Sequence, residues 1–128
     1  MSYSVAFGLL PGDDGRVTPD SFVEVHFSEA ERAEVGNGIV VHRLYRSGPE
    51  PTARRALLVR FPPGSQWPGV DVHEPGPEEV FVASGTFRGL TDEGSVHGPG
   101  TFLHLDAGTS HAPSTDTGGD LFVYYPEG

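Results

Sequence analysis

Hydrophobic residues along the chain fall in short segments, and stretches rich in Gly and Pro separate these segments from one another. Valine, leucine and phenylalanine are the commonest residues in the segments, and valine and phenylalanine favour strands. Short apolar segments at regular spacing, bounded by turn residues, are typical of an antiparallel sandwich or barrel. The pattern predicts strands at Ser4–Leu10, Phe22–Phe27, Ile39–Tyr45, Arg55–Phe61, Val70–His73, Glu79–Ser84, Thr101–Leu105 and Asp120–Tyr125.

One stretch has a helical signature. Ser28 and Glu31 have the spacing of a capping box, which predicts a short helix from Ser28 to about Val35. The stretch is polar on nearly all sides, so this helix would lie on the surface. No repeat and no shift in composition marks a second domain. We expect an N-terminal arm or edge strand over residues 1–20 and one barrel domain over residues 21–128.

Candidate metal ligands surround a Pro-Gly-Pro break between two predicted strands. Asp71 and His73 are two residues apart on a strand, so their side chains point to the same face. Glu78 opens the next strand and shares its face with Val80, Val82 and Ser84. If this common face lines the interior, three possible ligands converge across a hairpin. Spacing alone leaves a second interpretation open, a surface hairpin with solvated side chains.

A second stretch, residues 100–113, reads as a strand, a tight turn and His111 at the start of another strand. Together the two stretches resemble the two motifs of the cupin superfamily, G-x5-H-x-H-x3–4-E-x6-G and G-x5-P-x-G-x2-H-x3-N. Joint agreement of both spacings makes the resemblance specific. The matching positions are His73, Glu78 and Gly85 in the first motif, and Gly100, Gly108 and His111 in the second.

Within the superfamily the chain most resembles the ChrR-like branch, which includes the metal-binding domain of zinc anti-sigma factors and relatives of acetylacetone-cleaving dioxygenases. The resemblance implies an all-β, single-domain cupin barrel, also described as a jelly roll or double-stranded β-helix. It further implies a metal ion on His73, Glu78 and His111. It covers about residues 35–125 and rests on Arg60–Ser65, Glu78–Val82, Gly85–Phe87 and Gly108–Pro113.

The chain departs from the motifs at three positions. Asp71 replaces the first histidine, Asp106 replaces the proline of the second motif, and Thr115 replaces its final asparagine. An aspartate at a ligand position still supplies an oxygen donor, so metal binding is retained while the metal preference changes. Asp71 either binds the ion or accepts a hydrogen bond beside it. The expected ligands are therefore Asp71, His73, Glu78 and His111.

Three neighbouring residues have other expected places. Glu79 alternates with Glu78 and should point away from the site. His104 either lines the cavity or lies outside it, and a histidine outside the motifs is more often a hydrogen-bonded side chain than a ligand. Trp67 precedes the ligand strand and would cover the barrel mouth or pack at its rim.

The amino-acid composition excludes several kinds of site and partner. The 128 residues include no Cys, which excludes disulfides and thiolate metal sites. A net charge of −10 argues against nucleic-acid partners. All 8 basic residues are Arg, so Schiff-base chemistry on a lysine is absent. No apolar run has the length of a membrane span, and no signal peptide begins the chain, so we expect a cytoplasmic protein.

The ligand set leaves several functions open. Two histidines and a carboxylate resemble the facial triad of non-haem Fe(II) oxygenases, and the same ligands with zinc would polarise a carbonyl or a water. We expect one divalent ion, Fe(II) or Zn, with Mn or Ni as alternatives. The protein would be a dioxygenase, lyase or isomerase acting on a small oxygen-bearing metabolite, with no catalytic residue assigned. The alternatives are a metal- or ligand-binding sensor and a structural protein with a vestigial site. A homodimer formed through Ser4–Leu10 is also expected.

Overall fold

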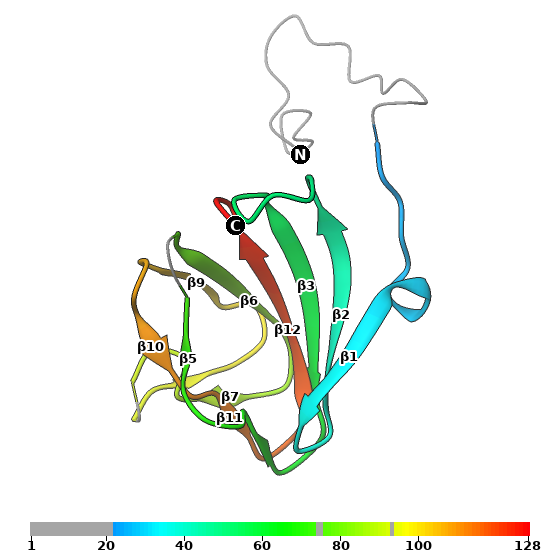
Figure 1. Ribbon diagram of the computed structural model, residues 1–128. Helices are drawn as coiled ribbons and strands as arrows, with labels where there is room; N and C mark the ends of the chain where they lie inside the picture. The colour runs from blue at the N-terminus through cyan, green and yellow to red at the C-terminus, as the bar shows by residue number, and fades with distance from the viewer. Residues whose placement is uncertain (1–21, 74–75, 93) are drawn as a thin grey trace, which may run out of the picture.

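The computed structural model describes residues 22–73, 76–92 and 94–128 (Figure 1). The predicted arm over residues 1–20 and the predicted strand Ser4–Leu10 lie outside the described residues, so the proposed division into arm and barrel stays a prediction. The described part contains one turn of 3-10 helix, η1 (Phe27–Glu29). Its strands are β1 (Glu31–Gly36), β2 (Ile39–Arg46), β3 (Arg55–Phe61), β4 (Ser65–Gln66), β5 (Asp71–Val72), β6 (Glu78–Ser84), β7 (Phe87–Arg88), β8 (Val96–His97), β9 (Phe102–Leu105), β10 (Ser110–His111), β11 (Ser114–Thr115) and β12 (Gly119–Tyr125).

These strands form three antiparallel sheets that face one another across a common interior. The largest sheet has the order β1-β2-β3-β12-β6-β9, and the smaller sheets have the orders β10-β5 and β4-β11-β7-β8. In Figure 1 the large sheet makes one wall, and β5, β10, β7 and β11 make the opposite side and the lower end. The crossing connections between sheets are those of a jelly roll, so the all-β prediction is confirmed.

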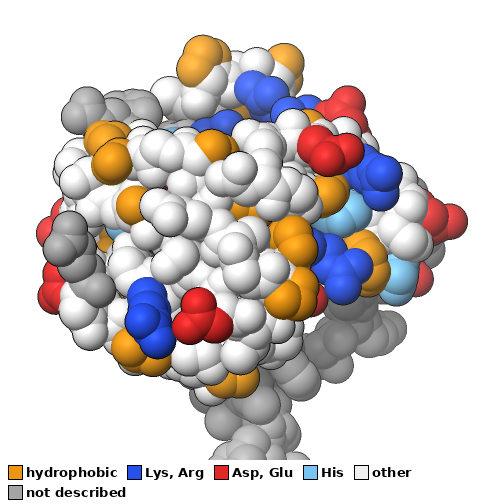
Figure 2. All heavy atoms as spheres, turned by 90° about the horizontal axis from the view of Figure 1, so that it is seen from below, with side chains coloured by type: hydrophobic (Ala, Val, Ile, Leu, Met, Phe, Trp, Pro, Cys, Tyr) orange, Lys and Arg blue, Asp and Glu red, His pale blue; other side chains and the backbone are white. Residues whose placement is uncertain are grey.

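The core lies between the two layers. It is built from inward-facing side chains of the large sheet, such as Val59, Val82 and Leu121, and is closed at the lower end by Phe87 and Leu90. Buried residues alternate with less buried ones over Glu78–Val82 of β6 and Leu121–Val123 of β12, as the period of a strand requires. At this lower end, seen directly in Figure 2, charged and apolar side chains are scattered among backbone and small polar groups.

The predicted helix at Ser28–Val35 is wrong. Only η1 is helical there, and Glu31–Gly36 forms strand β1, which pairs with β2. Asn37 and Gly38 both have positive φ, 56° and 77°, as a two-residue hairpin turn of this twist requires. A helix of so few residues is marginal by itself. In the hairpin, β1 forms backbone hydrogen bonds with β2, and Glu31 forms an ion pair with Arg43.

Several strand predictions also need correction. The expected strand Phe22–Phe27 is wrong, because residues 22–26 are extended without strand pairing and Phe27 begins η1. The expected strand Val70–His73 is shorter, Asp71–Val72. The predicted bounds of β2, β3, β6, β9 and β12 agree with the structure to within one or two residues. The two-residue strands β4, β7, β8 and β11 were not predicted, because so short a segment carries no periodicity.

Candidate metal centre

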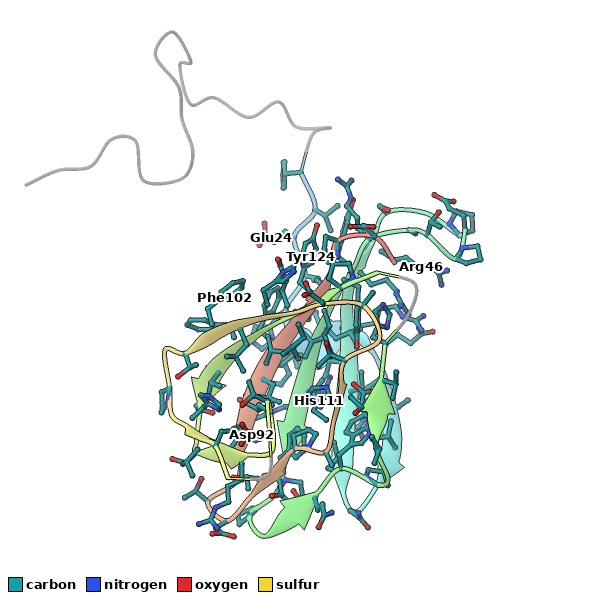
Figure 3. The ribbon with its side chains drawn as sticks, turned by 90° about the vertical axis from the view of Figure 1, so that its left-hand side faces the viewer. Glu24, Arg46, Asp92, Phe102, His111 and Tyr124 are labelled. Carbon is teal, nitrogen blue, oxygen red and sulfur yellow. The ribbon has the colours of Figure 1, made fainter. Side chains whose placement is uncertain are left out.

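The pairing of β5 with β10 places Asp71 directly opposite His111, although 40 residues separate them in the sequence. The Nε2 atom of His111 lies 2.9 Å from Oδ2 of Asp71. Glu78 opens β6 in the facing layer, and its Oε1 atom lies 3.1 Å from the same nitrogen. Donor atoms of the three side chains all lie within 4.8 Å of one another, and Figure 3 shows His111 between the two layers.

Two of the three side chains are shielded from solvent, and Asp71 is partly exposed. Glu78 is 5% exposed and His111 is 7% exposed. Burial by itself lowers the pKa of His111, but hydrogen bonds to Asp71 and Glu78 outweigh it and raise this pKa to about 9. The imidazole of the metal-free protein is therefore a cation at neutral pH, between two acidic side chains. The Nδ1 atom of His111 is buried and has no hydrogen-bond partner among the described residues.

Tyr125 connects the acidic group to the apolar interior. Its hydroxyl donates a hydrogen bond of 3.2 Å to Oε2 of Glu78. Burial, together with the neighbouring carboxylates of Glu78 and Asp71, raises the pKa of Tyr125 far above its ordinary value, so the phenol stays protonated. The remaining wall is largely apolar and encloses about 60 Å³. That wall consists mainly of Val41, Leu57, Val59, Phe61, Trp67, Leu121 and Val123.

His73, the other expected ligand, does not join this group in the structure. Its ring packs on Tyr125, with ring centroids 4.0 Å apart. Its Nε2 atom lies 2.7 Å from the carbonyl oxygen of Gly128 and is hydrogen-bonded to it. The carbonyl oxygen of His73 accepts a hydrogen bond from the backbone N–H of Gly108, which ties the ligand strand to the second motif. Thus the structure brings together Asp71, Glu78 and His111, and it places His73 beside them.

The donor set suits a divalent cation. One imidazole nitrogen and two carboxylate groups, all converging, are ligands that iron, zinc and manganese accept. A divalent ion would replace the proton on His111 and neutralise the two carboxylates. Without an ion, the protonated imidazole of His111 balances their negative charge. The residues therefore fit a metal ion.

The residues expected elsewhere are found there. Glu79 points to the outer face of the large sheet, where its Oε2 atom bonds to Nδ1 of His104 at 2.9 Å. His104 therefore lies outside the cavity, and its Nε2 atom is 3.3 Å from Asp106. Trp67 packs against the core beside Phe61, with ring centroids 6.4 Å apart. The role of Tyr125 was missed, because a tyrosine in a C-terminal apolar strand reads only as core.

The Glu79–His104 pair supports a test of the outer face by titration. The hydrogen bond to Glu79 is the main cause that raises the pKa of His104, and Asp106 adds to it. A raised pKa stabilises the fold below the ordinary pKa of histidine, and that contribution disappears as the pH rises through the folded-state value. We expect Glu79→Gln to lower the pKa of His104, measured by NMR titration of its imidazole protons. An unchanged titration curve would contradict the pairing.

The family model described as the ChrR Cupin-like domain matches residues 20–126. The chain belongs to the ChrR cupin-like family. The match confirms the resemblance inferred from the two motifs and the cupin fold inferred with it. No curated protein matches the chain.

Solved structures agree on the fold of this family member. An acetylacetone dioxygenase from Acinetobacter johnsonii is 18% identical, with a TM-score of 0.66, over 88% of this chain and 78% of that chain. An RmlC-like cupin from Shewanella frigidimarina NCIMB 400 is 20% identical, with a TM-score of 0.65, over 79% and 86%. The anti-sigma factor ChrR of Rhodobacter sphaeroides, solved in complex with SigE, is 22% identical, with a TM-score of 0.62, over 78% and 51%. The cupin thus spans about half of that ChrR chain.

Within residues 22–73, 76–92 and 94–128, no helix is long and apolar enough to cross a membrane. The predicted cytoplasmic location and the predicted homodimer both stay predictions.

Proposed function

We propose that this cupin is a metal-dependent enzyme that acts on a small oxygen-bearing molecule inside its barrel. The observation that carries the proposal is the convergence of Asp71, Glu78 and His111 at one end of a largely apolar interior. Polar groups that converge in an otherwise apolar pocket mark a binding site for a small molecule. A divalent ion bound there would act as a Lewis acid or bind oxygen ligands at its open positions.

His73 completes the proposed ligand set. The Nε2 atom of His73 is hydrogen-bonded to the carbonyl oxygen of Gly128. Metal binding would replace this hydrogen bond with a bond to the ion. This ring already lies against Tyr125, which itself contacts Glu78. The proposed ligands are two histidines and two carboxylates, and Asp71 is the one that differs from the motif. This set favours borderline to hard cations: Fe(II) and Zn first, Mn or Ni second.

The chain's own residues define what the substrate must be. The free volume of about 60 Å³ beside the ligands accommodates only a few water molecules. A substrate therefore places only its reacting end there unless side chains move. Tyr125 keeps its proton and can donate a hydrogen bond to a substrate oxygen once it releases Glu78. The valine and leucine walls favour a short alkyl group next to that oxygen, as in a small β-diketone or hydroxy-acid.

A sensor or ligand-binding module is the second candidate. The match to the ChrR family model and the likeness to a ChrR chain that was solved with SigE favour it. Both candidates need the metal ion, and only the enzyme needs turnover. The deciding experiment measures the metal content of the purified protein and then oxygen uptake and product formation with a panel of β-diketones and hydroxy-acids. Stoichiometric metal with turnover supports the enzyme. Stoichiometric metal without turnover of diketones or hydroxy-acids supports the sensor.

Asp71 provides a sharper test of the ligand set. We expect Asp71→Ala to weaken metal affinity by roughly 10- to 100-fold, because it removes a carboxylate at 2.9 Å from His111. Asp71→His should restore a nitrogen donor and keep one ion bound. Both affinities are measured by competition with a chromophoric chelator. If Asp71→Ala binds metal as tightly as the parent protein and has the same activity, Asp71 is not a ligand.

A further inference from the structure

The outer face of the large sheet carries a continuous row of side chains that runs across all six of its strands. Each member is the direct cross-strand partner of the next, so all of them point to the same side of the sheet. That side is the one opposite the core, because Leu121 and Leu105, their alternating neighbours, point inward. From β1 to β9 the row is Arg32, His42, Leu58, Phe122, Phe81 and Phe102.

The two halves of this row differ in what covers them. The β1 half is covered by η1, because the ring of Phe27 packs edge-on against His42 with centroids 5.2 Å apart. The β9 half is open. Phe81 is 41% exposed and Phe102 is 59% exposed, and with Phe122 and Tyr124 they line an apolar hollow. We call these four residues the aromatic face. Figure 3 shows Phe102 and Tyr124 on the same side of the molecule, away from His111.

The apolar surface extends beyond the aromatic face. Phe22, Val23 and Val25 line an adjoining groove that shares Phe122 with it. Five of the 8 exposed large hydrophobic residues in the described part of the chain thus belong to this single side. The exposed parts of Phe22, Phe81 and Phe102 alone amount to roughly 300 Å², at about 200 Å² for a whole side chain. A patch of this size matches the largest apolar patch of a typical monomer, which is often a functional surface, and it can form the centre of a standard interface.

Charge indicates which partner fits. The chain carries a net charge of −10, so two copies repel one another unless they meet on an uncharged surface. The aromatic face is such a surface. Its border carries both signs: His104 with Glu79 and Asp106 on one side, and the Arg60–Asp120 ion pair on another. A border of mixed sign can match itself under two-fold symmetry, whereas a strongly charged partner requires a border of one sign.

We propose that the aromatic face is the contact surface of a symmetric dimer and that its partner is a second copy of this chain. The rings of Phe81 and Phe102 form its buried centre, and the mixed charges around them set the orientation. The metal centre lies on the other side of the large sheet, so dimer formation does not cover it.

The test uses the full chain and measures mass by sedimentation equilibrium from nanomolar to high micromolar concentration. We expect the parent protein to form a dimer of two 13.7 kDa chains. Phe102→Glu places a charge at the centre of the contact and should raise the dissociation constant by roughly 100-fold or more. Val96→Glu is the matched control, because Val96 is 57% exposed but lies on β8 in another sheet, and it should remain dimeric.

Each other outcome overturns the proposal. A monomeric parent protein would mean that the face is covered by residues 1–21 or serves a different partner. A dimer that survives both Phe102→Glu and Phe81→Glu would place the contact elsewhere. Thermal melts show whether each variant is folded, and both phenylalanines are exposed enough that the fold tolerates a charge. Loss of the dimer in Val96→Glu as well would show that the effect is not specific to the aromatic face.

Discussion

His111→Ala is expected to abolish stoichiometric metal binding. The Nε2 atom of His111 lies 2.9 Å from Asp71 and 3.1 Å from Glu78, so it is the donor that both carboxylates share. Losing one ligand of a three- or four-ligand site should raise the dissociation constant on the order of 1,000-fold. The variant also removes the imidazolium that separates two acidic side chains, so its metal-free form should melt at a lower temperature. Metal per chain is measured by atomic emission after dialysis.

His104→Ala is the matched control for that experiment. It is the same substitution on a histidine of the outer face, where His104 contacts Glu79 and Asp106, and it should keep one ion per chain. His73→Ala is expected to lose the ion as well, since His73 completes the proposed ligand set. One equivalent of metal in His111→Ala would show that the ion binds elsewhere. Metal retained in His73→Ala but lost in His111→Ala would limit the protein ligands to Asp71, Glu78 and His111.

Phe87→Ala is expected to lower the free energy of unfolding by about 3–5 kcal/mol. Phe87 is fully buried at the lower end of the core, and its ring packs edge-on against Phe61 with centroids 5.0 Å apart. Backbone closes over the ring as well: a Cβ atom on Gly119 would lie 3.0 Å from its Cε1 atom. Because this part of the core cannot collapse easily, the cavity should persist. For a domain of this size the loss is a large share of total stability.

Urea denaturation measures this loss, followed by far-UV circular dichroism. Val96→Ala serves as the control, because its exposed side chain should change the free energy of unfolding by no more than about 0.5 kcal/mol. A Phe87→Ala variant within 1 kcal/mol of the parent protein, roughly the cost of a surface change, would contradict the packing described here.

The sequence by itself determined the all-β architecture and which side of β6 faces inward. Apolar segments bounded by turn residues, such as Arg55–Phe61, are typical of strands, and this segment forms β3 with the predicted bounds. The side of Glu78 follows from the period of two along a strand, so burial of Glu78 with Val80 and Val82 could be predicted. Ser84 was expected on the same side but is exposed, because an irregularity in the β6–β12 register breaks the alternation before it.

Only the tertiary structure decided which predicted ligands meet. Asp71 contacts His111 because two-residue strands pair across 40 residues of sequence, and no local pattern specifies such a register. The same holds for His73, whose ring is held by Tyr125 and the carbonyl oxygen of Gly128, 55 residues away. Residues 31–36 became β1 rather than helix for the same physical reason. Pairing with β2 supplies more hydrogen bonds than a short polar helix can, so a long-range contact overrides a local propensity.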